Sequence, residues 1–168
     1  MIEAVLLLAT VANADPRAAE ATQLFSAFCV QTNGSRDRAL AVLGNGNALA
    51  NRLSSETTDK LLGQEGTVGW AISSPSGAGL MLGYSGQAHC EIRVQEADEA
   101  SLAVQFENLQ HGFSTALEDI QKPESKNEQG TVRTFRAFKN GKAVIALSTN
   151  AKRVGDQQHL ITFDVPLD

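Results

Sequence analysis

Residues 67–95 have the sequence TVGWAISSPSGAGLMLGYSGQAHCEIRVQ, and this stretch decides the fold. Apolar side chains alternate with small or polar ones in three runs, around Trp70, Leu82 and Ile92. A period of two is typical of a β-strand with one buried face. The connections between the runs are short and contain glycine, which favours antiparallel neighbours. The stretch therefore predicts three consecutive antiparallel strands.

Helix signals come before these strands. Asp15 and Pro16 supply a capping side chain followed by proline in the first turn, and an apolar stripe of helical period follows. The stripe consists of Ala18, Ala21, Leu24, Phe25, Phe28 and Cys29. Ser35 is a second capping residue, so we expect a shorter helix that ends near Gly44, with one more helical turn over 54–63.

A long helix is predicted after the third strand. Asp98 suits its N-cap, and a continuous apolar face follows. This face consists of Leu102, Phe106, Leu109, Phe113, Leu117 and Ile120. The next segment, 122–130 (KPESKNEQG), predicts a charged, solvated loop.

The C-terminal part predicts three further strands. Asn140 and Gly141 suit a type I′ turn, so we expect them to join strands over 131–139 and 142–149, with a last strand over 161–165. The order ααβββαβββ indicates an α+β fold, with a mainly antiparallel sheet of about six strands flanked by helices. We expect the long helix on the sheet face opposite the first helix, which gives three layers.

Composition predicts one globular domain. The chain has 168 residues, of which 42% are hydrophobic and 20% charged, enough to bury a core and unlike a disordered chain. The formal net charge of -5 argues against a protein that coats nucleic acid, because such a protein needs excess cations to displace counterions.

The N-terminal segment predicts export. The apolar run over 4–11 (AVLLLATV) is shorter than a bilayer span. Small residues, Ala12 and Ala14, follow at the positions that a signal peptidase requires. We expect 1–14 to be a signal peptide and 15–168 the domain. The alternative is a buried first strand or helix.

Two cysteines, Cys29 and Cys90, agree with export. An even number of cysteines in an exported chain predicts one disulfide. Cys29 lies on the apolar stripe of the first helix and Cys90 on the apolar side of the third strand, so a bridge would tie helix to sheet. The alternative is two buried thiols in a cytosolic protein.

The sequence around the candidate nucleophiles does not match known nucleophile motifs. Residues 83–87 (GYSGQ) lack the last glycine of the G-x-S-x-G elbow, and a strand follows instead of a helix, so Ser85 is expected to be a turn residue. His89 adjoins Cys90, but neighbouring strand residues point to opposite faces. The thiol-protease interpretation is therefore not favoured, and we assign no catalytic residue.

The spacing of the histidines and glycines does not match metal-binding or nucleotide-binding motifs. His89, His111 and His159 fall in different predicted elements, with no Cys or carboxylate at ligand spacing, so no metal site is expected. No complete glycine-rich phosphate-binding motif occurs, so we expect no nucleotide cofactor.

Basic residues gather on the predicted C-terminal hairpin. They are Arg133, Arg136, Lys139 and Lys142, interleaved with Phe135 and Phe138. The plainest interpretation is a solvated sheet edge whose cations discourage strand addition. The alternative is a docking surface for an acidic protein partner or an anionic envelope component.

The chain resembles short exported proteobacterial proteins of unassigned function. The resemblance covers about residues 20–120 and rests on the signal-like start together with Cys29, Trp70, Cys90-Glu91-Ile92-Arg93-Val94, Ala97-Asp98-Glu99 and Phe106. The resemblance implies the periplasm, and no catalytic residue is carried over from it because none is established for such proteins. By fold analogy alone, a helix-flanked antiparallel sheet is similar to exported accessory domains of the PsbP type, which act by binding.

These observations predict a periplasmic or secreted, non-catalytic binding protein, such as an inhibitor, an immunity-type protein or an envelope accessory factor. The alternative is a small periplasmic hydrolase whose site the sequence does not reveal. A water-excluding pocket that contains His89 together with a carboxylate would favour this hydrolase.

Overall fold

The computed structural model describes residues 15–44, 48–63, 66–86, 88–114, 118–127, 130–139, 142–152 and 158–165. The predicted signal peptide and the turn residues Asn140 and Gly141 lie outside the described residues. The helical elements are α1 (Pro16–Phe25), the π-helical turn η1 (Ser26–Val30), α2 (Arg36–Leu43), α3 (Ser55–Leu62) and α4 (Glu99–Ser114). The strands are β1 (Ala50–Arg52), β2 (Val68–Ile72), β3 (Leu80–Ser85), β4 (His89–Gln95), β5 (Glu118–Gln121), β6 (Glu124–Asn127), β7 (Gly130–Lys139), β8 (Lys142–Lys152) and β9 (Gln158–Asp164).

Within the described residues, nine strands form one sheet in the order β1-β2-β3-β4-β9-β8-β7-β5, and β6 also pairs with β7. Each of these pairings is antiparallel. The N-terminal and C-terminal strands join because β9 returns to pair with β4, where Cys90 is opposite Phe163. The predicted α+β class and antiparallel sheet are confirmed, with more strands than the six expected.

The prediction for the segment after α4 is wrong. Ile120, expected on the apolar face of the long helix, lies in β5, and β6 occupies part of the expected loop. Leu117, predicted on the same helix face, lies outside the described residues. Pro123 restricts the residue before it to extended backbone, so this segment favours strands over a helix. Both short strands pair with β7.

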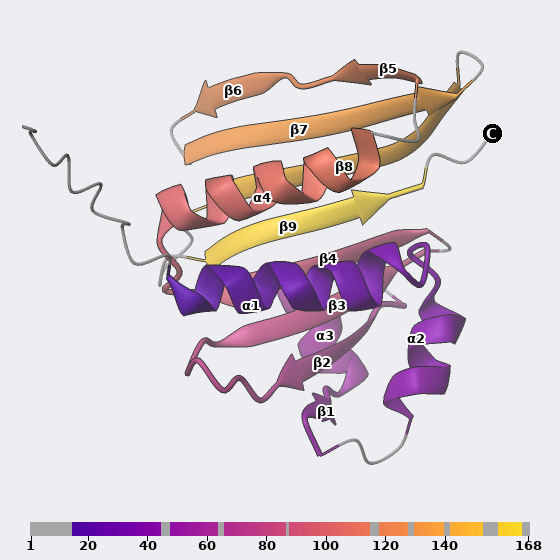
Figure 1. Cartoon of the computed structure of the whole chain (residues 1–168). Helices are drawn as coiled ribbons and strands as arrows, with labels where there is room; N and C mark the ends of the chain where they lie inside the picture. The colour runs from indigo at the N-terminus through magenta and orange to yellow at the C-terminus, as the bar shows by residue number, and fades with distance from the viewer. Residues whose placement is uncertain are drawn as a thin grey trace, which may run out of the picture.

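α1 and α4 lie side by side on one face of the sheet (Figure 1). The Asp98 N–H donates to Asp15 Oδ2 at 2.7 Å, and the Asp15 N–H donates to Ser101 Oγ at 3.2 Å. The prediction that the long helix lies opposite the first helix is therefore wrong. A third layer exists because α3 packs on the other face, where a Cβ at Gly83 would lie only 2.7 Å from Leu62 Cδ1.

The two faces of the central strands differ in polarity, which explains the side that α4 takes. Toward α1 and α4, β4 and β9 present side chains that are essentially fully buried, namely Cys90, Ile92, Ile161 and Phe163. The opposite face of the same strands carries His89, Glu91, Arg93, Thr162 and Asp164. Burial of Leu102 and Phe106 against the apolar face stabilises the folded state, whereas the polar face offers no such contact. The helix therefore packs on the apolar side of the sheet.

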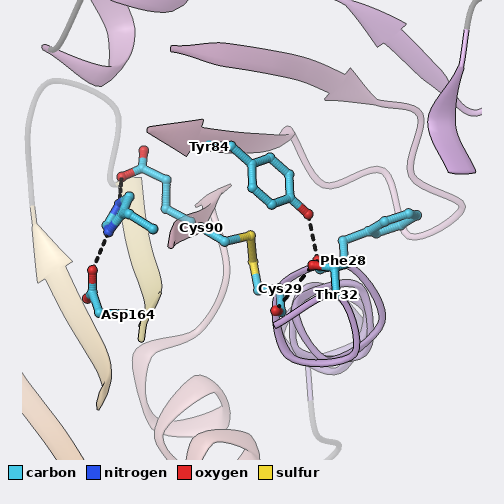
Figure 2. The surroundings of a disulfide bond; sticks show 8 residues. Phe28, Cys29, Thr32, Tyr84, Cys90 and Asp164 are labelled. Carbon is cyan, nitrogen blue, oxygen red and sulfur yellow. Dashed lines mark hydrogen bonds and ion pairs between the residues drawn. A yellow bond between two sulfur atoms is a disulfide. The ribbon is translucent and has the colours of Figure 1, made fainter. Parts of the chain in front are cut away.

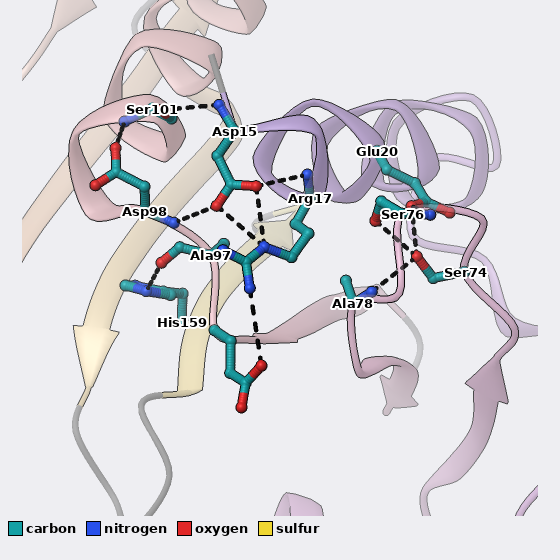
Figure 3. Close-up of polar contacts among 11 residues, drawn as sticks. Asp15, Arg17, Glu20, Ser74, Ser76, Ala78, Ala97, Asp98, Ser101 and His159 are labelled. Atoms are coloured by element: carbon teal, nitrogen blue, oxygen red, sulfur yellow. Dashed lines mark hydrogen bonds and ion pairs between the residues drawn. The ribbon is translucent and has the colours of Figure 1, made fainter. Parts of the chain in front are cut away.

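Helix starts follow the predicted capping residues. The Asp15 carboxylate accepts from the Arg17 N–H at 3.0 Å and begins α1. Asp98 accepts from the Ser101 N–H at 2.7 Å and begins α4 (Figure 3). Ser35 caps α2 in the same way. Each cap pairs a backbone donor that the helix itself leaves unpaired, an effect of about 1 kcal/mol.

Candidate functional site

Cys29 in η1 and Cys90 in β4 form a disulfide, with their Cα atoms 5.3 Å apart (Figure 2). Both residues are fully buried, and they are the two cysteines of the sequence. The predicted bridge is confirmed, and the alternative of two buried thiols is wrong. No thiol is left for nucleophilic or metal chemistry.

The π-helical turn positions this disulfide. In η1 the Phe28 carbonyl accepts a hydrogen bond from the Tyr84 hydroxyl at 2.5 Å, and also one from the Thr32 hydroxyl. Burial raises the pKa of Tyr84 to about 12, so the phenol stays protonated and acts as a donor. Tyr84 is opposite Cys90 in the β3–β4 register, so the hydrogen bond and the disulfide hold the same helical turn against the sheet.

An apolar cleft of about 720 Å³ lies beside this turn, between α1 and η1, α2 and the β1–β2 edge of the sheet. Its lining consists of Pro16, Ala19, Glu20, Gln23, Leu24, Ala27, Phe28, Leu43, Leu49, Ala50, Ile72, Ser73, Pro75 and Ser76. Glu20 is the one ionisable side chain among these lining residues. A largely apolar lining with a few polar groups, at this volume, is typical of sites for small molecules.

Glu20 is fixed in place at this cleft by the loop between β2 and β3 (Figure 3). Its Oε2 accepts from Ser74 Oγ at 2.5 Å and from the Ser76 N–H at 3.2 Å. Partial burial acts to raise the pKa of Glu20, but hydrogen bonds from Ser74 and Ser76 outweigh it, so the pKa lies below its ordinary value. The cleft therefore presents an oriented carboxylate at neutral pH.

Neither Glu20 nor the two serines belong to a motif that marks a site in the sequence. Glu20 lies 54 residues before Ser74 in the chain, and a lone glutamate on an exposed side of a helix is an ordinary surface residue. The only local signal is the pair of serines that flanks Pro75, which is typical of a turn. Tertiary structure brings the three groups together.

His89 lies between two carboxylates on the polar sheet face. Its Nδ1 is 2.6 Å from Asp164 Oδ1, and its Nε2 is 3.4 Å from Glu91 Oε2. Arg93 Nε donates to the other Glu91 oxygen at 2.6 Å. The hydrogen bonds to Asp164 and Glu91 raise the pKa of His89 to about 9 against the opposing effect of burial. His89 is therefore an imidazolium at neutral pH, within a paired charge network.

Ser85, His89 and Asp164 are in register on three adjacent strands. This order resembles the serine, histidine and carboxylate of a hydrolase. His89 does lie beside a carboxylate, which is one of the features expected for the hydrolase alternative. However, an imidazolium has no lone pair with which to accept the serine proton. His89 also does not line the apolar cleft. The geometry fits an ion-pair network better than a nucleophile and its base.

The four basic residues predicted on the hairpin do not all lie on one surface. Arg133 lies on the α4 face, like Phe135, and Arg136 lies on the opposite face because strand residues alternate. Arg133 is 3.9 Å from Glu99 and 3.5 Å from Glu124, so two carboxylates already compensate its charge. Arg136 is exposed.

For the other two basic residues of the hairpin, the structure describes only the backbone. Lys139 and Lys142 are paired at the ends of β7 and β8, next to the predicted turn residues, and their side chains lie outside the described residues. A basic surface at this hairpin that contains Arg136 would thus not include Arg133, which lies on the other face and is paired with two carboxylates.

The other histidines occupy separate places. His159 is buried in β9, and its Nε2 donates to the Ala97 carbonyl at 2.6 Å, while His111 is exposed on α4. Among the residues described, no group of three or more His, Cys, Asp or Glu side chains could hold a metal ion. No helix in the described ranges has the length and hydropathy needed to cross a bilayer.

Comparison of the chain with protein-family models, with curated proteins and with solved structures finds no significant match.

Proposed function

We propose that the chain is an exported, non-catalytic binding protein and that the apolar cleft is its binding site. The observation that supports this function is the cleft itself, an apolar concavity of about 720 Å³ that ends at one fixed carboxylate. An apolar hollow of this kind stabilises a ligand by removing apolar surface from water.

The disulfide supports an oxidising compartment, with the periplasm as the proposed location. Cys29 and Cys90 are paired and buried, and such bridges persist outside the cytosol. The apolar run over 4–11 and the small residues after it also support export.

The hydrolase alternative has one observation in its favour, the alignment of Ser85, His89 and Asp164. The two hydrogen bonds that keep His89 protonated count against it. Replacement of His89 by Ala separates the two functions. A binding protein keeps its ligand affinity in this variant, whereas a hydrolase loses its activity.

Cleft binding is tested with N-phenyl-1-naphthylamine, a neutral apolar probe whose fluorescence rises in a dry site. We expect saturable binding to the oxidised protein. Ala27 lines the cleft, so Ala27→Trp should fill part of it and weaken binding at least about tenfold. Val104→Trp is the matched control, because Val104 is 55% exposed on α4 and does not line the cleft.

Thermal unfolding verifies that both tryptophan variants fold. Equal affinity of the Ala27→Trp variant and the wild-type protein, with both folded, would contradict the cleft as the binding site. Absence of saturable binding by the wild-type protein, across a range of apolar probes, would remove the support for the proposed function.

A further inference from the structure

The cleft combines a largely apolar lining with one charged side chain. Most of its lining is apolar, from residues such as Ala19, Leu24, Ala27 and Ile72, and among the described residues that line it only Glu20 is charged. A carboxylate that is covered by a ligand loses contact with water, which costs free energy unless the ligand supplies a partner for it. The chemistry of the ligand near Glu20 is therefore constrained more strongly than the chemistry of its tail.

One oxygen of Glu20 is already engaged. The hydrogen bonds from Ser74 Oγ and the Ser76 N–H both end on Oε2, at 2.5 and 3.2 Å. These bonds leave Oε1 for a further donor. A second donor to a carboxylate whose position is already fixed costs little conformational entropy on the protein side.

The loop that holds Glu20 is itself cross-linked. Ser74 Oγ accepts from the Ala78 N–H at 3.1 Å and lies 2.8 Å from Ser76 Oγ (Figure 3). The carboxylate therefore sits in a network of hydroxyl and backbone donors rather than on a freely rotating side chain. The hydrogen bonds of this network also favour the ionised form of Glu20.

Charge complementarity selects among ligand classes. A fatty carboxylate would place a second anion beside Glu20, and a neutral apolar ligand would leave the covered carboxylate without a partner. A protonated amine donates hydrogen bonds and carries the opposite charge, so it forms the stronger, charge-assisted pair. The net charge of -5 on the chain also favours the approach of a cation.

We infer that the ligand of the cleft is a small cationic amphiphile, with an apolar tail against α1, α2 and β2 and one protonated amine bound by Glu20. This inference rests on the proposed function, because it names the ligand class of the same cleft. The volume of about 720 Å³ falls in the range of small-molecule sites.

The test compares three probes that share an eight-carbon tail: n-octylamine, 1-octanol and octanoate, at pH 7 and low salt. Isothermal titration calorimetry on the oxidised wild-type protein should give an affinity for n-octylamine at least about tenfold above that for 1-octanol, with octanoate weakest. A hydrogen bond to a charged group accounts for a preference of this size. Higher ionic strength should reduce the preference.

The variant Glu20→Gln removes the charge and keeps the shape of the side chain. We expect the affinities for n-octylamine and 1-octanol to converge to within about twofold in this variant, because the charge-assisted hydrogen bond to the amine is lost. Glu56→Gln is the matched control, because Glu56 is an exposed carboxylate on α3 that does not line the cleft and changes the net charge equally.

The outcomes separate the two claims. Binding of all three probes with equal affinity, or an amine preference that persists in Glu20→Gln, would overturn the cationic ligand and leave the cleft as a binding site. No binding of any probe would overturn the proposed function itself. The comparison of the three probes on the wild-type protein decides the inference even where Glu20→Gln fails to fold.

Discussion

The hydroxyl of Tyr84 in β3 lies 2.5 Å from the carbonyl oxygen of Phe28 in the π-helical turn. This hydrogen bond crosses from the sheet to the helical layer one strand away from the Cys29–Cys90 disulfide. A wide turn changes the face on which each side chain leaves the helix, and π-helical turns occur often at functional sites. Here the turn brings Cys29 to the sheet while Ala27 and Phe28 line the apolar cleft.

Tyr84→Phe removes this hydrogen bond and keeps the ring, which packs edge-to-face against Trp70 with centroids 6.0 Å apart. Thr32 still donates to the Phe28 carbonyl, so the oxygen retains one partner. We expect the free energy of unfolding to fall by about 1 kcal/mol. Urea denaturation of the oxidised protein measures it, and an unchanged midpoint would contradict the importance of this bond.

The disulfide is expected to be a major source of stability. Replacement of both Cys29 and Cys90 by Ala removes a cross-link between positions 61 apart. Loop entropy predicts a loss of about 4 kcal/mol in the free energy of unfolding. Urea denaturation measures the loss, with the wild-type protein under reducing conditions as the control. A loss below about 1 kcal/mol would show that the sheet and helices alone hold the turn in place.

The His89 network predicts a pH dependence of stability above neutrality. The folded-state pKa of His89 is about 9 and the unfolded value is near 6.5. The stabilisation is therefore complete below about pH 6.5 and is lost as pH rises through 9. Partial exposure reduces the effect, so we expect a change on the order of 2 kcal/mol.

The measurement is the free energy of unfolding between pH 6 and pH 10. His89→Gln should remove most of the decrease in this range, because the glutamine side chain does not titrate. His111→Gln controls for the loss of a histidine elsewhere. A decrease that is equally steep in His89→Gln would assign the pH dependence to other groups.

The basic hairpin provides a second, separate surface to test. We expect the replacement of Arg136, Lys139 and Lys142 by Ser to leave the fold intact, since an exposed charge such as that of Arg136 contributes less than about 1 kcal/mol. Association with vesicles that contain phosphatidylglycerol should become slower and less dependent on salt.

Arg133→Ser is the comparison for this surface, since Glu99 and Glu124 already compensate Arg133. We expect it to change vesicle association less than the triple replacement does. If vesicle association is the same for the wild-type protein and the triple variant, the hairpin is a solvated edge and not a docking surface.

The mature N-terminus is expected at Asp15. Cleavage after Ala14 would turn the backbone nitrogen of Asp15 into the α-amine, and this nitrogen already donates to Ser101 Oγ at 3.2 Å. Intact-mass measurement of protein from the periplasm should show the loss of residues 1–14. Recovery of the full-length chain from the cytoplasm would contradict the proposed location.

Local chemistry in the sequence determined the starts of the helices and six of the nine strands that the structure describes. Asp15, Ser35 and Asp98 cap helices through hydrogen bonds that span two or three residues, so each cap is visible in a short stretch of sequence. The alternation around Trp70 and Ile92 likewise determined strands and their buried side. Strand alternation also places Arg133 and Arg136 on opposite faces, so their spacing in the sequence already separates these two cations.

Tertiary structure alone decided the candidate site. Glu20 meets Ser74 across 54 positions, and the cleft needs α1, α2 and the β1–β2 edge to be packed before it exists. The side taken by α4 depends on the polarity of two sheet faces, which is known only after β9 pairs with β4. Capping and alternation act between near neighbours in the chain, whereas a cleft arises from surfaces of elements that have no local preference for one another. The sequence therefore determined most of the helices and strands and the disulfide partners, whereas packing decided the short strands β1, β5 and β6 and the position of the cleft.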